Sequence, residues 1–509
     1  MVGVEYGKVK YWGGHPNSTR DIAQSSPCTY LDLAQHLLEP LIVTYAGHHG
    51  FPVRFNTQLV EATREEAGTV LCKLLDLVTN VTYEVRTKYL FGADGGRSTV
   101  ARSFQFQFDQ KPSQGVAMNV LFKADLTNIM REREAQLHWI MRPDTASKFG
   151  AGPCLRMIRP WTEWILMVIN PGGTESVAKR LTPDNPELVA YIKELIGDDT
   201  IDVEISRVDG WVVREDVAET FSSGQNVFLL GDAAHRHPPA LALGSNTCIQ
   251  DAYNLGWKAA YVAKGLAGPA LLDSYTVERQ PIGAQLVKEA NECFRAHGRV
   301  WASLGMFAPT PEEGARQIAE LYETNEAGAA RREELFHALE GNRREGESMG
   351  LASGQFYVSS AVYLDDEPEA RPEVKGDPVV TMQISTYPGS RLPHAWLDVA
   401  ERGKEFSTHD LAGKGQFALF YGRGGEGWAA AAEKVREATG IPIKAHGIGF
   451  GLEHHDVYRD WTAIRGVKED GCILVRPDRF VAWRSQSVVP DFEAKLTEVL
   501  NKVLSRDGL

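Results

Sequence analysis

Hydrophobic residues in the first third of the chain alternate with polar ones or form short apolar runs, a pattern typical of strands. The runs lie at residues 70–75, 82–91, 115–124, 137–141 and 164–169. Those within residues 115–170 predict one antiparallel sheet. A short helical insert is expected after this sheet, at residues 183–198.

Residues 28–50 predict a strand followed by a helix whose apolar side chains recur at helical spacing. These side chains are Leu37, Leu38, Leu41, Ile42 and Tyr45. Pro40 fits only near the first turn of this helix, where its missing N–H costs little. Gly50 is expected to end the helix.

The remaining pattern predicts a short buried strand at residues 226–230 and a helix at residues 247–264. Residues 273–345 are expected to be mostly helical. Residues 365–377 are charged and contain proline without periodicity, which indicates a linker before the compositional unit 378–509. That unit is expected to hold a strand at 416–421, a helix at 428–440, a hairpin of 472–476 and 481–483, and a last helix at 491–504.

Length and composition narrow the class of protein. At one domain per ~100–200 residues, 509 residues suggest about three domains. A net charge of -13 argues against a nucleic-acid partner, which needs clustered Lys and Arg. The six cysteines form no CxxC pair, so neither a zinc knuckle nor a dithiol redox centre is indicated. No apolar run reaches about 18 residues and residues 1–14 resemble no signal peptide, so no membrane span and a cytoplasmic location are expected.

The strongest chemical signal is the run GDAAHRHPP at residues 231–239, directly after the strand predicted at 226–230. A carboxylate at the end of a buried strand needs hydroxyl or N–H donors, so Asp232 is expected to bind a ligand. The next segment, GSNT at residues 244–247, opens a helix whose free N–H groups suit an anion or a carbonyl oxygen. Together they suit a polyol attached to a negatively polarised ring, a combination found in flavins.

A second interpretation of this run stays open. Gly-Asp-Ala-Ala after a strand also occurs as an ordinary strand-to-helix turn with the aspartate as N-cap. The extended string that ends in DAYNLGWK at residues 251–258 favours the ligand interpretation.

Residues 231–258 resemble the second flavin signature of the aromatic-ring hydroxylase superfamily, which has the p-hydroxybenzoate hydroxylase-like fold. The stretch SNTCIQD at residues 245–251 is similar to its phenol hydroxylase and chlorophenol monooxygenase branch. The resemblance implies that Asp232 binds the ribityl chain of FAD and that Pro239 lies near the reacting face of the ring. The residues implied to lie against the pyrimidine edge are Gly244, Ser245, Asn246 and Thr247.

A second stretch, YLFGADGGRSTVAR at residues 89–102, resembles the family's Asp-Gly motif, which is linked there to flavin and NAD(P)H. Asp94 thereby joins the candidate cofactor residues, with Ser98 as the cap of a following helix. A purely structural strand-turn-helix is the alternative. Gln35 resembles a family glutamine that contacts the flavin, although a surface glutamine at a helix start is common.

The C-terminal stretch resembles the thioredoxin-like domain attached to phenol hydroxylases, through PGSRLPH at residues 388–394 and VRPD at 475–478. In place of thioredoxin's cysteine pair it has GRGGEG at residues 422–427, which excludes dithiol exchange. A packing or homodimer role is expected instead.

The resemblance covers nearly all of residues 10–509 and implies an α/β fold. The fold would combine a truncated Rossmann-like FAD-binding domain, an interleaved antiparallel-sheet substrate domain and a C-terminal thioredoxin-like domain. The expected divisions are 1–104 (partial FAD-binding domain with substrate-domain strands), 105–210 (substrate domain), 211–290 (second FAD-binding part), 291–377 (helical segment and linker) and 378–509 (thioredoxin-like domain).

The chain departs from the family pattern in two places. The family begins with a strand, a GxGxxG turn and a helix that bind the pyrophosphate, and the start of this sequence has none of them. We expect that Met1 is a misplaced start and that the full protein is longer, rather than that the chain is a truncated relative of the family. After the proline pair the chlorophenol branch usually has Thr-Asn-Gly-Leu-Gly, whereas residues 240–244 read ALALG. Ala242 in place of glycine stiffens the loop beside the flavin.

The implied activity is a monooxygenase reaction. NAD(P)H reduces bound FAD, O2 adds at the flavin C4a as a hydroperoxide, and the distal oxygen passes to a phenolic ring. The substrate is expected on the sheet of residues 115–170, near Trp211, and no side chain is assigned as catalytic. The alternative is a non-catalytic relative that acts as a binding or scaffold protein. Halogenation is disfavoured because residues 161–165 lack the Trp-x-Trp-x-Ile-Pro hallmark, and the pair His454–His455 is read as solvated, with no metal expected.

Overall fold

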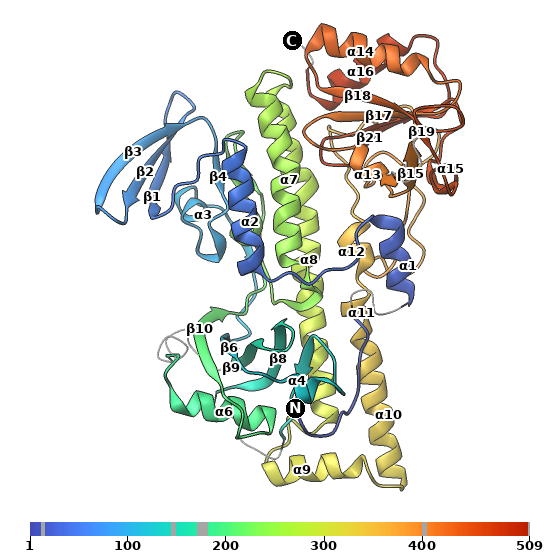
Figure 1. Cartoon of the computed structure of the whole chain (residues 1–509). Coiled ribbons are helices and arrows are strands. Elements are labelled where there is room, and N and C mark those ends of the chain that lie inside the picture. Colours follow the sequence, from blue (N-terminus) through green and yellow to red (C-terminus); the bar gives the residue numbers. More distant parts are fainter. Residues whose placement is uncertain (12–15, 144–148, 171–181, 400–404, 507–509) are drawn as a thin grey trace.

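The computed structural model describes residues 1–11, 16–143, 149–170, 182–399 and 405–506. Two long helices, α7 (Gly244–Ala263) and α8 (Asp273–Ser303), run through the middle of the molecule (Figure 1). A small three-stranded sheet lies on one side of α7, and the C-terminal unit, meaning residues 385–506, lies on the other. A five-stranded sheet and the helices α9 (Pro311–Glu320) and α10 (Glu326–Gly341) lie toward the far end of α8.

A short parallel sheet packs against α7 and α8. Its strand β4 (Leu90–Gly92) pairs in parallel with β13 (Val227–Leu229), which also pairs antiparallel with β12 (Ser222–Ser223). All side chains of β13 are buried, so the strand predicted at 226–230 is confirmed. The other elements of this side are α2 (Gln35–His48), β1 (Thr57–Arg64), β2 (Val70–Asp76), β3 (Val81–Thr87), α3 (Thr99–Ser103), β5 (Phe108–Gln110), β11 (Asp216–Ala218) and β14 (His235–Arg236).

The beginning of the chain differs from the sequence expectation. Residues 28–34 form no strand, and β4 is an edge strand of its sheet, so no described strand lies beside it there. Helix α2 begins at Gln35, which places Pro40 inside the helix rather than in its first turn. None of the residues of α2 is buried. The run at 82–91 is divided into β3 and β4, and β1 was not predicted because its side chains are mostly exposed.

The antiparallel sheet predicted for residues 115–170 is confirmed and extended by two strands. Its order is β10-β6-β9-β8-β7. The strands are β6 (Val116–Lys123), β7 (Leu137–Trp139), β8 (Ala151–Arg159), β9 (Glu163–Asn170) and β10 (Glu204–Val212). Met118, Val120 and Phe122 of β6 face the predicted helical insert, α6 (Pro186–Ile196). The alternate residue Ala117 packs toward Phe294 and Trp301 of α8, as strand periodicity requires.

The C-terminal unit contains a four-stranded sheet of order β18-β17-β20-β21. Strands β17 (Phe417–Tyr421) and β18 (Ile443–Gly447) are parallel and are joined by α14 (Gly427–Thr439). Strands β20 (Cys472–Val475) and β21 (Val481–Ser485) form the predicted hairpin, and α16 (Phe492–Val503) is the predicted last helix. A second sheet holds β15 (Trp396–Val399), β16 (Glu405–Ser407) and β19 (His454–His455). The remaining α-helices among the described residues are α1 (Pro16–Ser25), α4 (Thr127–Met130), α11 (Arg343–Gly346), α12 (Met349–Ser353), α13 (Thr408–Leu411) and α15 (Asp460–Ile464).

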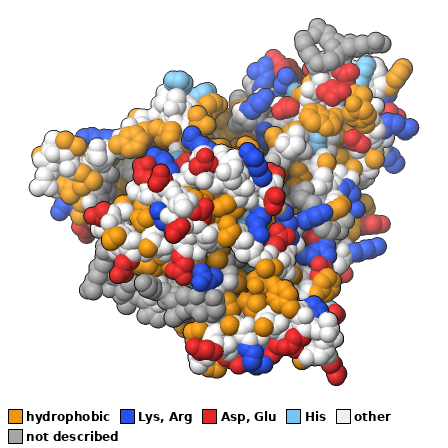
Figure 2. All heavy atoms as spheres, turned by 60° about the horizontal axis from the view of Figure 1, so that its bottom comes forward, with side chains coloured by type: hydrophobic (Ala, Val, Ile, Leu, Met, Phe, Trp, Pro, Cys, Tyr) orange, Lys and Arg blue, Asp and Glu red, His pale blue; other side chains and the backbone are white. Residues whose placement is uncertain are grey.

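The surface carries side chains of every kind. Figure 2 shows acidic, basic and hydrophobic side chains intermixed on the face that it presents. All six cysteines are free. Among the residues that the structure describes, none of the helices combines the length and the apolar character needed to cross a membrane.

Candidate functional site

The candidate site lies where two parallel strands end. Gly92 of β4 is in register with Leu229 of β13, so the carboxyl ends of both strands meet at one edge. Asp94 follows the first strand and Asp232 follows the second. In open α/β sheets, ligands bind outside the carboxyl ends of the strands. The parallel pairing therefore places both predicted carboxylate positions at the edge where a ligand is expected.

Asp232 lies in a single 3-10 turn, η2 (Gly231–Ala233), that packs on the first turn of α7. Gly231 has φ +56, and a Cβ there would lie 2.7 Å from Cys248 Sγ, so only glycine permits this approach. The Cys248 thiol lies 3.9 Å from Asp232 Oδ1. Asp232 is exposed and caps no helix, because the cap position of η2 is Leu230. The N-cap interpretation of Asp232 is therefore wrong, and its carboxylate is available to a ligand.

The start of α7 lies beside this carboxylate and has no side-chain cap. Its first N–H groups and the positive end of its dipole are consequently free for a ligand. Ser245 and Asn246 are exposed and Gly244 is half-buried, whereas Thr247 is buried. Asn246 Nδ2 donates to Ala242 O at 3.0 Å, which ties the helix start to the preceding loop. Of the four predicted pyrimidine-edge residues, Thr247 thus faces inward.

The loop before α7 carries an unusual backbone. It contains the 3-10 turn η3 (Ala240–Ala242), which follows the exposed Pro239. Within it Leu241 has φ 70 and Ala242 has φ 53, a left-handed conformation that favours glycine. The Leu241 side chain is buried against Ala290 and Cys293 of α8, which holds the turn in place.

Asp94 and Gln35 are placed differently from Asp232. Asp94 Oδ2 accepts hydrogen bonds from Thr99 N at 2.6 Å and Val100 N at 3.2 Å, so this carboxylate organises its own turn. Ser98 caps α3 as predicted, with its Oγ accepting from Ala101 N at 2.8 Å. Gln35 is exposed on α2 and donates to Glu39 Oε1 on the same helix at 2.5 Å. In the part of the chain that the structure describes, no hydrogen bond links either residue to Asp232.

A buried ionic group that the sequence analysis did not assign supports the site. Asp251 of α7 is fully buried and accepts hydrogen bonds from Gly231 N at 3.0 Å, His235 Nε2 at 2.8 Å and Arg279 Nε at 2.8 Å. Burial alone would raise the pKa of Asp251, but Arg279 and His235 hold it below its ordinary value. Asp251 therefore fixes the Asp232 turn against α7 as a carboxylate. It lies four residues after the buried Thr247, and that helical spacing could have indicated a shared inward face.

Aromatic side chains connect the loop of residues 240–243 with the five-stranded sheet. Phe294 of α8 packs against the buried cluster of Leu241 and also against the cluster formed by Ala117 and Ile169. Trp211 of β10, which the sequence analysis expected near the substrate, belongs to that second cluster with Trp301. Aromatic walls of this kind suit a planar apolar ligand.

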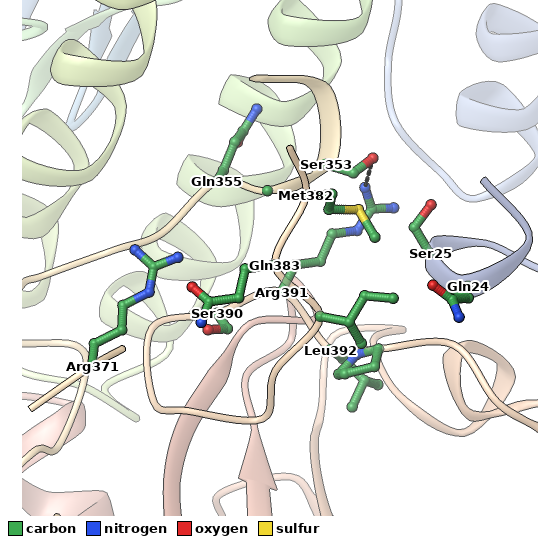
Figure 3. Close-up of a pocket in the computed structure, with 13 residues that line it drawn as sticks. Gln24, Ser25, Ser353, Gln355, Arg371, Met382, Gln383, Ser390, Arg391 and Leu392 are labelled. Carbon is green, nitrogen blue, oxygen red and sulfur yellow. Dashed lines mark hydrogen bonds between the residues drawn. The ribbon is translucent and has the colours of Figure 1, made fainter. Parts of the chain in front are cut away.

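A separate pocket lies between α1, α12 and the C-terminal unit. Figure 3 shows Arg371, Arg391 and Ser353 among the side chains around it, with a 3.4 Å hydrogen bond from Arg391 Nη1 to Ser353 Oγ. None of the predicted cofactor residues lines this pocket. The pocket therefore lies apart from the predicted cofactor residues at the strand ends.

The residues at the strand ends fit FAD. An exposed carboxylate at Asp232 can accept hydrogen bonds from ribityl hydroxyls, and the uncapped start of α7 can bind an electron-rich ring edge. The glycine at 231 provides the close backbone approach between the two.

Comparison with known proteins agrees with this geometry. A family model described as FAD binding domain matches residues 6–290, and one described as aromatic-ring hydroxylase, C-terminal, matches residues 385–506. A 2,4-dichlorophenol 6-monooxygenase of Delftia acidovorans is 37% identical, with 99% of this chain and 85% of the relative covered. A phenol 2-monooxygenase of Pseudomonas sp. (strain EST1001) is 39% identical, with 98% of this chain and 79% of the relative covered.

Solved structures give the same family. The flavin-dependent monooxygenase PieE, in complex with FAD and substrate, superposes with a TM-score of 0.90 at 34% identity, with 99% of this chain and 85% of that chain covered. Aklavinone-11 hydroxylase with FAD and aklavinone has a TM-score of 0.74 at 28% identity, with 96% of this chain and 81% of that chain covered. The expected α/β fold with an FAD-binding domain is thereby confirmed. The chain belongs to the FAD-dependent aromatic-ring monooxygenases, in the group that includes phenol and chlorophenol monooxygenases.

Proposed function

We propose that this enzyme uses FAD, NAD(P)H and O2 to hydroxylate a phenolic ring. The observation that supports this proposal best is the position of the exposed Asp232 carboxylate beside the uncapped start of α7, at the carboxyl ends of β4 and β13. The names of the relatives, phenol and 2,4-dichlorophenol monooxygenases, support a phenolic substrate.

In this proposal the chain's own residues bind and orient the cofactor and the substrate, and they exclude water from the reacting atoms. Asp232 accepts hydrogen bonds from the ribityl chain, and Gly244, Ser245 and Asn246 present the helix start to the pyrimidine edge. The positive end of the α7 dipole stabilises negative charge that develops on that edge. Bound FAD would supply the redox and oxygen-transfer chemistry, with NAD(P)H as the reductant.

The phenolic ring is proposed to lie against the aromatic side chains between α8 and the five-stranded sheet. Phe294 and Trp211 would contact its faces, because they are half-buried and belong to the cluster that adjoins the loop of residues 240–243. Their apolar surface would keep water from the reacting atoms.

Three further features belong to this proposal: the location of the enzyme, its oligomeric state and the fold of the C-terminal unit. We infer a cytoplasmic enzyme, and we infer a homodimer, whose molar mass light scattering of the purified chain would test. We also propose that the C-terminal unit is thioredoxin-like. The order β17-α14-β18, followed by β20, β21 and α16, supports this assignment.

The test of the function compares Asp232→Asn with a matched control, Asp199→Asn, at an exposed aspartate outside the site. The purified chain is titrated with FAD by visible absorption, and substrate-dependent NAD(P)H oxidation is followed with phenol and 2,4-dichlorophenol. Loss of a charged hydrogen-bond acceptor should weaken FAD binding roughly 10- to 100-fold in Asp232→Asn. The control should bind FAD as the wild type does.

A folded, colourless wild-type chain that takes up no FAD would contradict the proposal and would favour the non-catalytic scaffold. Equal FAD binding by the wild type and Asp232→Asn would leave the enzyme in its family but would remove Asp232 from the cofactor site.

A further inference from the structure

Two histidines that are eight residues apart in the sequence meet inside the C-terminal unit. His446 lies on β18 and His454 on β19 (Figure 1), and their relative exposures are 2% and 4%. His446 Nδ1 lies 3.2 Å from His454 Nε2. The polar stretch around His454–His455 predicts a solvated pair, and this prediction is wrong for His454, because only His455 is exposed.

A carboxylate lies beside the two imidazole rings. Glu453 Oε2 lies 3.4 Å from His454 Nε2 and 4.0 Å from His446 Nδ1. Zinc binds histidine nitrogen and carboxylate oxygen at about 2.0–2.2 Å in a tetrahedron, which places ligand atoms roughly 3.3 Å apart. Two of the separations, 3.2 and 3.4 Å, match the edges of such a tetrahedron, and the 4.0 Å separation would close with a small movement of the exposed Glu453 side chain.

From these distances the geometry points to a zinc site formed by His446, Glu453 and His454. Imidazole and carboxylate are suitable ligands for a divalent transition metal of this kind. Because the Glu453 side chain is 56% exposed, the metal can enter from that side, and solvent can occupy the fourth position.

The surroundings agree with two neutral imidazoles that offer lone pairs. Burial lowers the pKa of His446 to about 3 and also lowers that of His454, whose pKa Glu453 raises in part. Phe406 packs edge-on against His454 with ring centroids 5.1 Å apart, which keeps the pair in an apolar setting. Lys444 is the cation whose charge acts on both rings, and its side chain is exposed rather than inserted between them.

The site would act on the loop that joins its ligands. Residues 448–453 connect β18 to β19, and Gly449 N donates to His454 O at 2.9 Å across the loop base. Phe450 at the tip is 91% exposed, and Arg423 Nη2 donates to its carbonyl at 2.6 Å. A metal bound by both ends of the loop would hold this exposed aromatic residue in one position. The role is therefore structural and is separate from the flavin chemistry.

The test uses the full chain, freed of metal with a chelator and then titrated with zinc chloride. Bound zinc is counted by mass spectrometry after gel filtration, and cobalt is substituted to give the intense visible bands of tetrahedral coordination beyond the flavin absorption. The wild type should bind one zinc per chain with tetrahedral cobalt bands, and zinc should raise its Tm. None of these readouts depends on FAD binding or turnover.

The variants are His446→Gln, His454→Gln and Glu453→Gln, with His455→Gln as the matched control on the same strand. Loss of a residue that only hydrogen-bonds to a metal ligand typically lowers metal affinity about 10–100-fold. Loss of a ligand itself should therefore lower zinc affinity roughly 100-fold or more. His455→Gln should retain the metal. If the buried histidine variants fail to fold, Glu453→Gln decides, because its exposed side chain is not needed for packing.

The proposal is overturned if the wild type retains no more zinc than Glu453→Gln, or if His455→Gln loses the metal equally. In either case the histidine pair is only a hydrogen bond between neutral rings.

Discussion

Ala242 occupies a backbone position that suits glycine. Its φ of 53 is left-handed, and an L-residue is destabilised by about 1–2 kcal/mol in that conformation, whereas glycine is not. The loop is held there by the buried Leu241 side chain and by the hydrogen bond from Asn246 to Ala242 O. The departure from the family sequence noted at this position therefore lies at a strained point beside the proposed flavin edge.

Ala242→Gly is expected to stabilise the chain by up to about 1 kcal/mol. Relief of the left-handed backbone should exceed the roughly 0.4–1 kcal/mol that glycine costs through the unfolded chain. Urea unfolding followed by circular dichroism measures the change. Ala240→Gly is the control: Ala240 is buried without a positive φ, so glycine there should destabilise. Destabilisation by both variants would show that the turn at 242 is not strained.

The elements are joined by a fully buried group of ions. Arg476, which follows β20, donates two hydrogen bonds to Glu278 of α8, from Nη1 at 2.6 Å and from Nη2 at 2.8 Å. Its Nη2 also donates to Asp478 Oδ2 at 2.6 Å. Lys258 of α7 donates to Glu278 Oε2 at 2.7 Å. Both Arg476 and Asp478 come from the VRPD stretch that the sequence analysis singled out. Its structural task is to lock the C-terminal unit onto α7 and α8.

Arg476→Met should destabilise the chain by about 3–5 kcal/mol, because Glu278 and Asp478 would stay buried without their guanidinium partner. Thermal and urea unfolding of the wild type and of this variant measure the effect. The control is Arg436→Met, at an exposed arginine of α14 whose partner Glu433 is also exposed, and it should change stability very little. An Arg476→Met chain as stable as the wild type would mean that the units are held by apolar packing alone.

Glu278 should make the stability of the chain depend on acidity. Burial alone would raise the pKa of Glu278, but Arg476 and Lys258 hold it below its ordinary value of 4.5. A lowered pKa in the folded state gives a contribution that is complete above pH 4.5 and is lost as the pH falls toward the lower value. The Tm of the wild type should therefore fall more steeply below that pH than the Tm of Glu278→Gln. The exposed control Glu437→Gln should follow the wild-type slope, and parallel curves for all three chains would exclude this role.

At the scale of the whole molecule, α8 connects the two halves of the site. Its first part packs against the parallel sheet through Tyr275, and its later part meets the five-stranded sheet through Phe294 and Trp301. One continuous helix thus spans the distance between the proposed flavin edge and the proposed aromatic substrate wall. Such positioning is the protein's main contribution in an enzyme whose cofactor supplies the chemistry.

Phe294→Ala is expected to lower kcat/KM for the phenolic substrate roughly 10- to 100-fold, since about 1.5–3 kcal/mol of aromatic contact is lost. FAD affinity, read from the visible absorption, should be unchanged. Phe336→Ala, at an exposed position of α10, is the control and should leave both quantities as in the wild type. Unaltered kcat/KM in Phe294→Ala would place the substrate elsewhere.

Much of the fold follows from local sequence. Strand β13, helices α7, α14 and α16, and the cap at Ser98 were predicted, because periodicity, turn chemistry and capping act between residues close in the chain. The motif around Asp232 identified the family for the same reason, since its glycine, carboxylate and helix start all lie between residues 231 and 247.

Other features were decided only by tertiary structure. Nothing in the residue pattern predicted that Asp251 would meet Arg279, that Arg476 would meet Glu278, or that His446 would lie against His454. Whether a titratable side chain is buried with a partner or solvated depends on packing between remote segments, which no local pattern encodes. The sequence by itself determined the cofactor family and most elements. The packing of α7, α8 and the C-terminal unit decided which charged groups are buried, and therefore which of them support the site.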